Sequence, residues 1–151
     1  MINAMNNLAA HVWADNVPEL ATASWSNALL LGRELVTSGM TGHPVTRNAA
    51  EAGEPLDAYQ QTLLVLGKIL ALAEAAGGHI GNIYRLTVYV TAITDKEAIG
   101  RARKDFFAGQ TVYPTSTLVE VSGLVFPELC VEIEAGIHLD ADLRSLIKQA
   151  D

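Results

Sequence analysis

The sequence has little cysteine, little positive charge and no long apolar run. Its single cysteine, Cys130, cannot form an internal disulfide, and its place between Leu129 and Val131 favours a small apolar strand residue. The formal net charge of −7 argues against a nucleic-acid partner, because phosphate binding requires a basic surface. No basic segment precedes an apolar stretch at the N-terminus, and no apolar run reaches about 18 residues. We therefore expect a cytoplasmic protein with no membrane partner.

Motifs that would indicate a metal or an organic cofactor are also missing. The glycine-containing segment 77–81 follows a predicted helix and precedes a predicted strand, the reverse of the order in a phosphate-binding loop. One cysteine and four scattered histidines provide no zinc spacing. Neither a nucleophile elbow nor a catalytic triad is present. We expect no cofactor, so any chemistry would use carboxylates, hydroxyls, backbone groups and bound water.

Length and hydropathy predict a single domain over residues 1–151. An apolar fraction of 50% is enough for a packed core. The core is expected over about residues 23–137, and a short C-terminal helix over about 140–150, where leucines and isoleucine recur at helical spacing. The high hydrophobicity for a small chain favours an oligomer that buries further surface.

The first third of the chain predicts a hairpin between irregular segments. Residues 1–21 show no clean period and predict an irregular lead-in. Strands are expected over residues 23–31 and 34–39, joined by a tight turn. Gly, Thr, Asn and Pro in residues 40–55 predict a loop.

Two helices are expected further along the chain. Residues 56–76 carry apolar side chains at three-to-four spacing, begin after a proline and end at a glycine pair. Thr94 and Glu97 have the spacing of a capping box. They predict a second helix over residues 94–108.

Three further strands complete the expected sheet. Residues 82–93 are dense in β-branched and aromatic residues. The stretch 113–135 predicts two strands joined by a loop, because apolar and acidic residues alternate at both of its ends. These two strands carry the polar residues Thr115, Ser116, Thr117, Glu120, Glu132 and Glu134.

The element order β-β-α-β-α-β-β predicts an α+β fold of two layers. A mixed β-sheet would pack on two helices that both lie on one of its faces. The other face then needs a cover. With no further long helix available, a partner subunit is the natural one.

Several short motifs follow one another along residues 23–137. They are the segments 37–39, 59–62, 74–77, 88–91, 106–107, 119–121 and 131–135, together with Pro114. Their order and spacing resemble those of the Rid family, the reactive intermediate deaminases also called the YjgF family. The resemblance implies a chorismate-mutase-like fold and a homotrimer with a small-molecule cleft at each subunit interface. It also implies hydrolysis of enamines or imines to a keto acid and ammonia, without a metal or organic cofactor.

The same resemblance implies the site residues. Glu132 would be the catalytic residue that orients water, and Trp25 would replace the tyrosine that usually forms a wall of the cleft. The remaining substrate contacts would come from two segments, comprising Ser38, Gly39, Thr115, Ser116, Thr117 and Leu118.

The chain departs from the family pattern where the substrate carboxylate would bind. Two residues after the proline the family has an arginine, whereas this chain has Ser116, which cannot form a bidentate bond to a carboxylate. Gly100 replaces the usual asparagine of the second helix. The sequence thus resembles an Arg-less branch of the family. Either the ligand is neutral or differently charged, or Arg33, Arg101 or Arg103 binds the carboxylate instead, or the protein is not an enzyme of this type.

Three functions remain open at this point. The first is a deaminase or hydrolase of a small nitrogen-containing metabolite. The second is a non-catalytic, metabolite-binding or regulatory trimer, since Ser116 has no charge. The third is RNA cleavage, which the net charge of −7 and the lack of a basic stripe disfavour.

Overall fold

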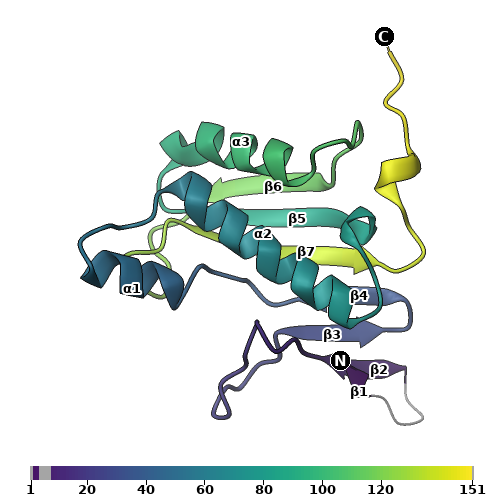
Figure 1. Ribbon diagram of the computed structural model, residues 1–151, viewed down its shortest axis with the longest axis horizontal. Helices are drawn as coiled ribbons and strands as arrows, with labels where there is room; N and C mark the ends of the chain where they lie inside the picture. The colour runs from purple at the N-terminus through teal and green to yellow at the C-terminus, as the bar shows by residue number, and fades with distance from the viewer. Residues whose placement is uncertain (1, 4–7, 151) are drawn as a thin grey trace.

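The computed structural model describes residues 2–3 and 8–150. Its strands form one seven-stranded sheet in the order β1-β2-β3-β4-β7-β5-β6 (Figure 1). Neighbouring strands are antiparallel except β5 and β6, which run parallel. The strands are β1 (Ile2–Asn3), β2 (Ala9–Val12), β3 (Ala28–Leu31), β4 (Glu34–Thr37), β5 (Ile83–Val90), β6 (Thr115–Glu120) and β7 (Val131–His138).

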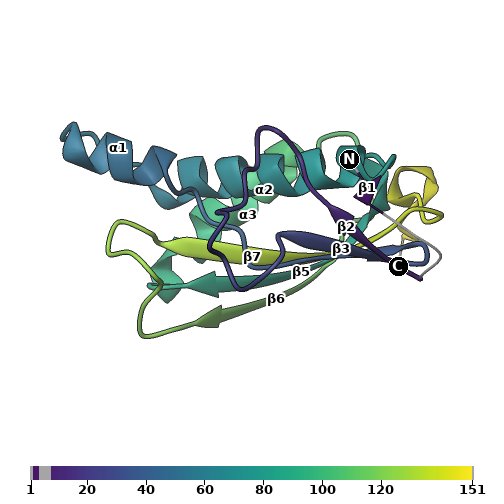
Figure 2. The same ribbon diagram turned by 90° about the horizontal axis from the view of Figure 1, so that it is seen from below.

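The helices α1 (Val45–Glu51), α2 (Ala58–Ala75) and α3 (Lys96–Phe106) lie on one side of this sheet (Figure 2). Short 3-10 turns occur at Ile80–Asn82, Ile93–Asp95 and Leu143–Ser145. The predicted α+β fold, with a mixed sheet packed on helices in two layers, is therefore confirmed.

The long helix α2 begins and ends where its sequence favours it. Asp57 and Gln60 form a reciprocal capping box, which satisfies two of the first N–H groups. Gly77, with φ of 88°, follows the helix in the left-handed conformation that glycine adopts most easily. Between these ends, α2 buries one face against the sheet.

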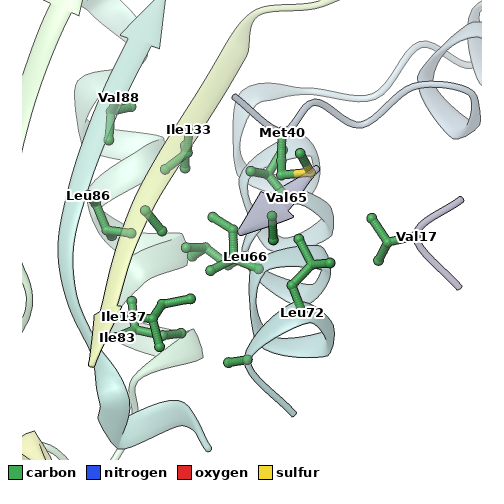
Figure 3. Packing of buried hydrophobic residues seen from close by; sticks show 14 of the residues in the cluster. Val17, Met40, Val65, Leu66, Leu72, Ile83, Leu86, Val88, Ile133 and Ile137 are labelled. Atoms are coloured by element: carbon green, nitrogen blue, oxygen red, sulfur yellow. The ribbon is translucent and has the colours of Figure 1, made fainter. Parts of the chain in front are cut away.

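The core fills the space between α2 and the central strands. Figure 3 shows Val65, Leu66 and Leu72 of α2 beside apolar residues of β5 and β7. These helix residues are fully buried, as are Ile83 and Ile133 on the strands. Burial of each such side chain contributes about 1.5–3 kcal/mol. The core thus fixes β7 and β5, the two strands at the centre of the candidate site.

Three elements lie where irregular structure was expected. The predicted lead-in contains β1 and β2; β2 pairs with β3 and buries Ala10 and Val12. Four residues are too few for a clear alternating pattern. The predicted loop over residues 40–55 contains α1, which has no side-chain N-cap and buries only Thr46. A helix without a cap or an apolar face gives little periodic signal.

Several predicted bounds were wrong. Strand β3 begins at Ala28 rather than at residue 23, because Asn27 is bonded through its N–H to Glu19 and through its side chain to Val17 O. Strand β4 ends at Thr37 rather than at residue 39, and β5 spans 83–90 rather than 82–93.

The capping box at Thr94 was also wrong. Helix α3 begins at Lys96, and its N-cap residue, Asp95, has helical backbone angles and makes no side-chain cap bond. The preceding 3-10 turn Ile93–Asp95 leads the chain into the helix instead.

The predicted C-terminal helix over 140–150 is a single 3-10 turn, Leu143–Ser145. Ile147 is exposed, so the apolar spacing of this segment does not form a buried face that would stabilise a helix.

No described element of the same chain covers the sheet face opposite the helices (Figure 2). We call it the open face. Leu29, Leu31, Val36 and Val119 lie on it and are 36–42% exposed. Tyr89, Glu132 and Glu134 share the open face, because each alternates with a buried strand residue.

Candidate functional site

Glu132 is held on the open face by the strand that carries it. Its neighbours Val131 and Ile133 are fully buried on the helix side, so the alternation of β7 directs Glu132 the other way. No described residue donates a hydrogen bond to its carboxylate, whereas Tyr89 donates from its hydroxyl to Glu134 Oε1 at 3.0 Å. Partial burial, followed by the nearby charge of Glu134, raises the pKa of Glu132. The result is an unpaired, partly desolvated carboxyl group.

Gly39 lies directly against this carboxyl group. A Cβ atom at position 39 would overlap Glu132 Oε1. The approach is set by backbone pairing, since Met40 and Ile133 exchange N–H···O bonds of 2.8 and 3.1 Å. Residues 37–39 lie opposite only residues 134 and 135, so the β4 side has one extra residue before this bridge. Such a bulge redirects the chain, and glycine is the residue that fits here.

Ser38 fixes the neighbouring segment to the same place. Its hydroxyl donates to Ser26 O at 2.6 Å, and its N–H donates to Asn27 O at 2.8 Å. Trp25, the chain neighbour of Ser26, is 57% exposed. The structure therefore brings four predicted site residues into one region. We call them the Glu132 group, consisting of Trp25, Ser38, Gly39 and Glu132.

The other predicted contacts lie on β6, an edge strand, and point to both of its faces. Ser116 pairs with the buried Leu86, and Leu118 pairs with the buried Val88, so both face the helices. Thr115 and Thr117 alternate to the open face. These four residues therefore cannot all contact a ligand from one side of the strand.

Ser116 accepts a hydrogen bond of 2.5 Å from Nη1 of Arg103 on α3. A cavity of about 250 Å³ opens beside this pair. Its walls include Leu86, Gly100, Phe107, Tyr113 and Pro114. Arg103 is half-buried, so its charge is partly removed from water, and this burial lowers the pKa of the guanidinium.

Of the three cations left open by the sequence, only Arg103 meets Ser116. Arg33 donates to Asp140 at 2.7 Å, and Arg101 lies 5.8 Å from the centre of the Tyr59 ring. The sequence alone left all three arginines as candidates for the carboxylate contact. The helical spacing of Gly100 and Arg103 would have favoured Arg103, because residues three apart share a helix face.

The Glu132 group and Ser116 do not meet within one chain. Glu132 pairs with Tyr89 on the open face, whereas Ser116 pairs with Leu86 on the helix side. Strands β7 and β5 also separate β4 from β6, which corresponds to roughly 14 Å at the usual strand spacing. Each chain thus carries two separate halves of the predicted site.

A second hollow lies at the other end of the sheet. It has a volume of about 470 Å³ and is lined by His11, Trp13, Ala14, Asp15, Val17, Pro18 and Glu19. None of the predicted site residues borders it. His11 and Glu19 form an ion pair of 2.9 Å on its wall.

Among residues 2–3 and 8–150, no group of three His, Cys, Asp or Glu side chains could hold a metal ion. None of the helices in this part of the chain has both the length and the hydrophobicity that a membrane span requires.

Comparison with known families decides the relationship of the chain. The sequence model of the family described as Endoribonuclease L-PSP matches residues 16–138. The chain belongs to this family, the Rid (YjgF) family. The resemblance noted in the sequence is confirmed.

Three relatives illustrate the relationship. Protein PA3499 of Pseudomonas aeruginosa, described as of unknown function, has a crystal structure that is 61% identical, with a TM-score of 0.90, covering 97% of this chain and 100% of that one. The putative reactive intermediate deaminase TdcF of Escherichia coli K12 is 36% identical over 106 residues, 70% of this chain and 78% of TdcF. The 2-iminobutanoate/2-iminopropanoate deaminase of the same strain is 30% identical over 122 residues, 80% of this chain and 91% of that one.

A crystal structure of E. coli TdcF with bound serine has a TM-score of 0.66 and 33% identity, covering 78% of this chain and 90% of that one. The Rid-family fold therefore extends over most of the chain.

Proposed function

We propose that this protein hydrolyses the imine or enamine form of a small amino-acid-derived metabolite, and that two copies of the chain together form the cleft. The observation that carries the proposal is the Glu132 carboxyl group, partly buried, unpaired among the described residues and held against Gly39. The reaction class is supported by one relative named as a 2-iminobutanoate/2-iminopropanoate deaminase and another named as a putative reactive intermediate deaminase.

The reaction needs a group that accepts a proton from water and returns it to nitrogen. In the carboxylate form, Glu132 accepts a hydrogen bond from a water molecule and orients it toward the C=N carbon. As the water oxygen bonds to that carbon, its proton passes to Glu132 and then to the nitrogen. Glu132 then accepts the hydroxyl proton of the resulting carbinolamine and passes it to the nitrogen, the C–N bond breaks, and a carbonyl compound and ammonia leave. The raised pKa of Glu132 suits this exchange, because it brings the carboxyl group closer to working pH.

The cleft requires a second copy because the two halves of the site lie apart in one chain. A neighbouring subunit that covers the apolar open face would place its β6 edge near the Glu132 group. Closed assemblies of identical chains repeat one contact, so each interface would form one complete cleft. We propose the homotrimer expected for the family.

Binding without turnover is the second candidate function, and Ser116 is the observation that favours it. The residue occupies the position of the family's arginine and cannot itself pair with a substrate carboxylate. A protein that kept the cleft but lost the reaction would bind a metabolite reversibly and release no ammonia.

The test is hydrolysis of 2-imino acids generated in situ from L-alanine, L-leucine and L-phenylalanine by an amino-acid oxidase. The wild type is expected to release ammonia faster than a no-protein control. Glu132→Gln is expected to lose about 10²–10⁴-fold in rate. Glu134→Gln is the matched control on the same strand and face, and it should retain activity at neutral pH.

Ammonia release no faster than the no-protein control would contradict the proposed reaction. Saturable binding of a keto acid under the same conditions would then favour the second candidate. Equal rates for wild type and Glu132→Gln would remove the role of Glu132.

A further inference from the structure

One stripe of residues on α3 and at its C-cap lines the cavity beside Ser116. Gly100, Arg103, Lys104 and Phe107 follow the i, i+3, i+4, i+7 pattern of a single helix face. All four border the 250 Å³ cavity that ends at Ser116. This stripe therefore forms one wall of the cavity, and its residues Arg103 and Lys104 give that wall a positive charge.

Arg103 has a charge that no described carboxylate neutralises. Among the described residues, its guanidinium makes one hydrogen bond, to the neutral hydroxyl of Ser116, although a guanidinium has five N–H donors. Arg47 and Arg33, by contrast, are paired with Glu128 and Asp140. An unpaired charge that is partly removed from water is costly. A bound anion would offset that cost, and the planar fork of Arg103 fits a carboxylate in a bidentate manner.

Gly100 has no side chain to fill the cavity beside α3. A Cβ atom at position 100 would meet no heavy atom within 4 Å, so the backbone there does not require glycine. A larger side chain would extend into the cavity beside Arg103.

The remaining walls are largely apolar, since Leu86, Phe107, Tyr113 and Pro114 contribute to them. The volume of about 250 Å³ lies just below the range of about 300–1,000 Å³ typical of pockets for drug-sized ligands. A small acid with an apolar side chain matches both the charge and the walls.

We propose that Arg103, positioned by Ser116, binds the carboxylate of the ligand, and that the adjoining cavity selects 2-imino acids with a branched or aromatic side chain. The reaction is that of the proposed function, on which this inference rests for the imine group. The residue that binds the carboxylate would then lie on helix α3, whereas the arginine expected for the family would lie at the position of Ser116 on strand β6. The same contact would hold the keto acid product.

Calorimetric binding of two keto acids tests the inference apart from turnover. The wild type is expected to bind 4-methyl-2-oxopentanoate more tightly than pyruvate, because only the former has a side chain that fills the cavity. Arg103→Met is expected to weaken binding of 4-methyl-2-oxopentanoate roughly ten- to a hundredfold, the loss of one charged hydrogen-bond pair. Arg103→Lys should recover part of the affinity.

Arg101→Met is the matched control, since it removes the same charge from the same helix without bordering the cavity. Its affinity should stay within about twofold of wild type. The neutral ketone 4-methylpentan-2-one should bind the wild type and Arg103→Met equally, which a general loss of structure would not produce. In turnover, Arg103→Met should raise KM more than it lowers kcat.

The outcomes separate this inference from the proposed function. Arg103-dependent binding without ammonia release supports the inference and contradicts the proposed reaction. Turnover with unchanged affinity in Arg103→Met overturns the inference and leaves the reaction standing. A wild type that binds neither keto acid, or that prefers pyruvate, also overturns it.

Discussion

Ser116 and Glu132 lie on opposite faces of the same sheet. Ser116 pairs with the buried Leu86 and receives a bond from Arg103 on the helix side, whereas Glu132 pairs with Tyr89 on the open face. A single chain therefore cannot use both residues on one small ligand. The exposed apolar residues of the open face supply a reason for copies to associate, and association supplies the missing half of the cleft.

Gly39→Ala should destabilise the protein and displace Glu132, because the added Cβ would overlap the Glu132 carboxyl group. The overlapped atoms belong to a flexible, half-buried side chain that can move aside, so the loss should lie at the low end of the roughly 1–3 kcal/mol typical of overpacking, and activity should fall with the displacement. Gly67→Ala is the matched control, since a Cβ there meets nothing within 4 Å. Gly67 lies in the exposed middle of α2, so alanine should stabilise by about 0.5–1 kcal/mol. Denaturant unfolding would measure both, and equal effects would argue against the close packing of Gly39.

The pH dependence of activity should report the raised pKa of Glu132. The carboxylate form accepts the proton from water, so the rate should fall as pH decreases through a pKa above the ordinary glutamate value of 4.5. Glu134→Gln removes the nearby charge that also raises the pKa of Glu132. The fall in rate on the acidic side should therefore occur at lower pH in this variant. A fall at unchanged pH in Glu134→Gln would contradict the assigned cause.

The free energy of unfolding should decrease as pH rises through the pKa of Glu132, whereas a salt-bridged carboxylate would make it increase. The native state binds the proton of Glu132 more tightly than the unfolded chain does, so ionisation of this group lowers stability as pH rises. Glu132→Gln should therefore melt at a higher temperature than wild type at pH 7. Well below pH 4.5, the ordinary pKa of glutamate, the carboxyl group is protonated in both states and the difference should vanish. Thermal unfolding at both pH values checks this, and a destabilised variant at pH 7 would contradict it.

Gly100→Leu should block the cavity without loss of fold. The leucine side chain would occupy the space beside Arg103, so binding of 4-methyl-2-oxopentanoate should fall at least as far as in Arg103→Met. Gly100→Ala is the control, because one methyl group fits where no heavy atom lies within 4 Å. Alanine should also stabilise α3 by about 0.5–1 kcal/mol. Unchanged binding in Gly100→Leu would place the ligand elsewhere.

Charge on the open face should weaken self-association. Val36→Lys places an ammonium group among apolar residues that a partner would cover, and dissociation to monomers is expected. Val45→Lys, on α1 at the helix side, introduces the same charge on another exposed valine (46%, against 36% for Val36) and should leave the assembly intact. Light scattering coupled to size exclusion would distinguish them, and a wild type that is already monomeric would contradict the proposed trimer.

The parts of the fold with strong local patterns were predicted from the sequence. Helix α2 has a capping residue, Asp57, and a long apolar face, so its span was predicted to within a few residues. The sequence also predicted that a partner subunit covers one sheet face, because it contains only two long predicted helices and both pack on the other face. By contrast, α1 buries only Thr46 and lacks a side-chain cap, and nothing in its local sequence distinguishes it from a loop.

The candidate site was less accessible to sequence reasoning. Glu132 and Gly39 were named from the family resemblance, and their roles stay predictions. Their contact could not be foreseen, because it depends on a bridge between Met40 and Ile133 that joins distant segments. The choice of Arg103 among three arginines also required the fold. Arg33 is occupied by Asp140, more than a hundred residues away in the chain, and no local pattern encodes that pair.

Subunit complementation tests the two-copy cleft most directly. Glu132→Gln and Arg103→Met chains would be co-expressed with different tags, and their mixed assemblies purified and assayed at low substrate. If each cleft takes Glu132 from one copy and Arg103 from the next, a random mixture should recover about a quarter of the wild-type activity, because both neighbours must supply the intact residue. If each site lies within one chain, every site carries one defect, and the mixture should be no more active than the two variants alone. That second result would contradict the account.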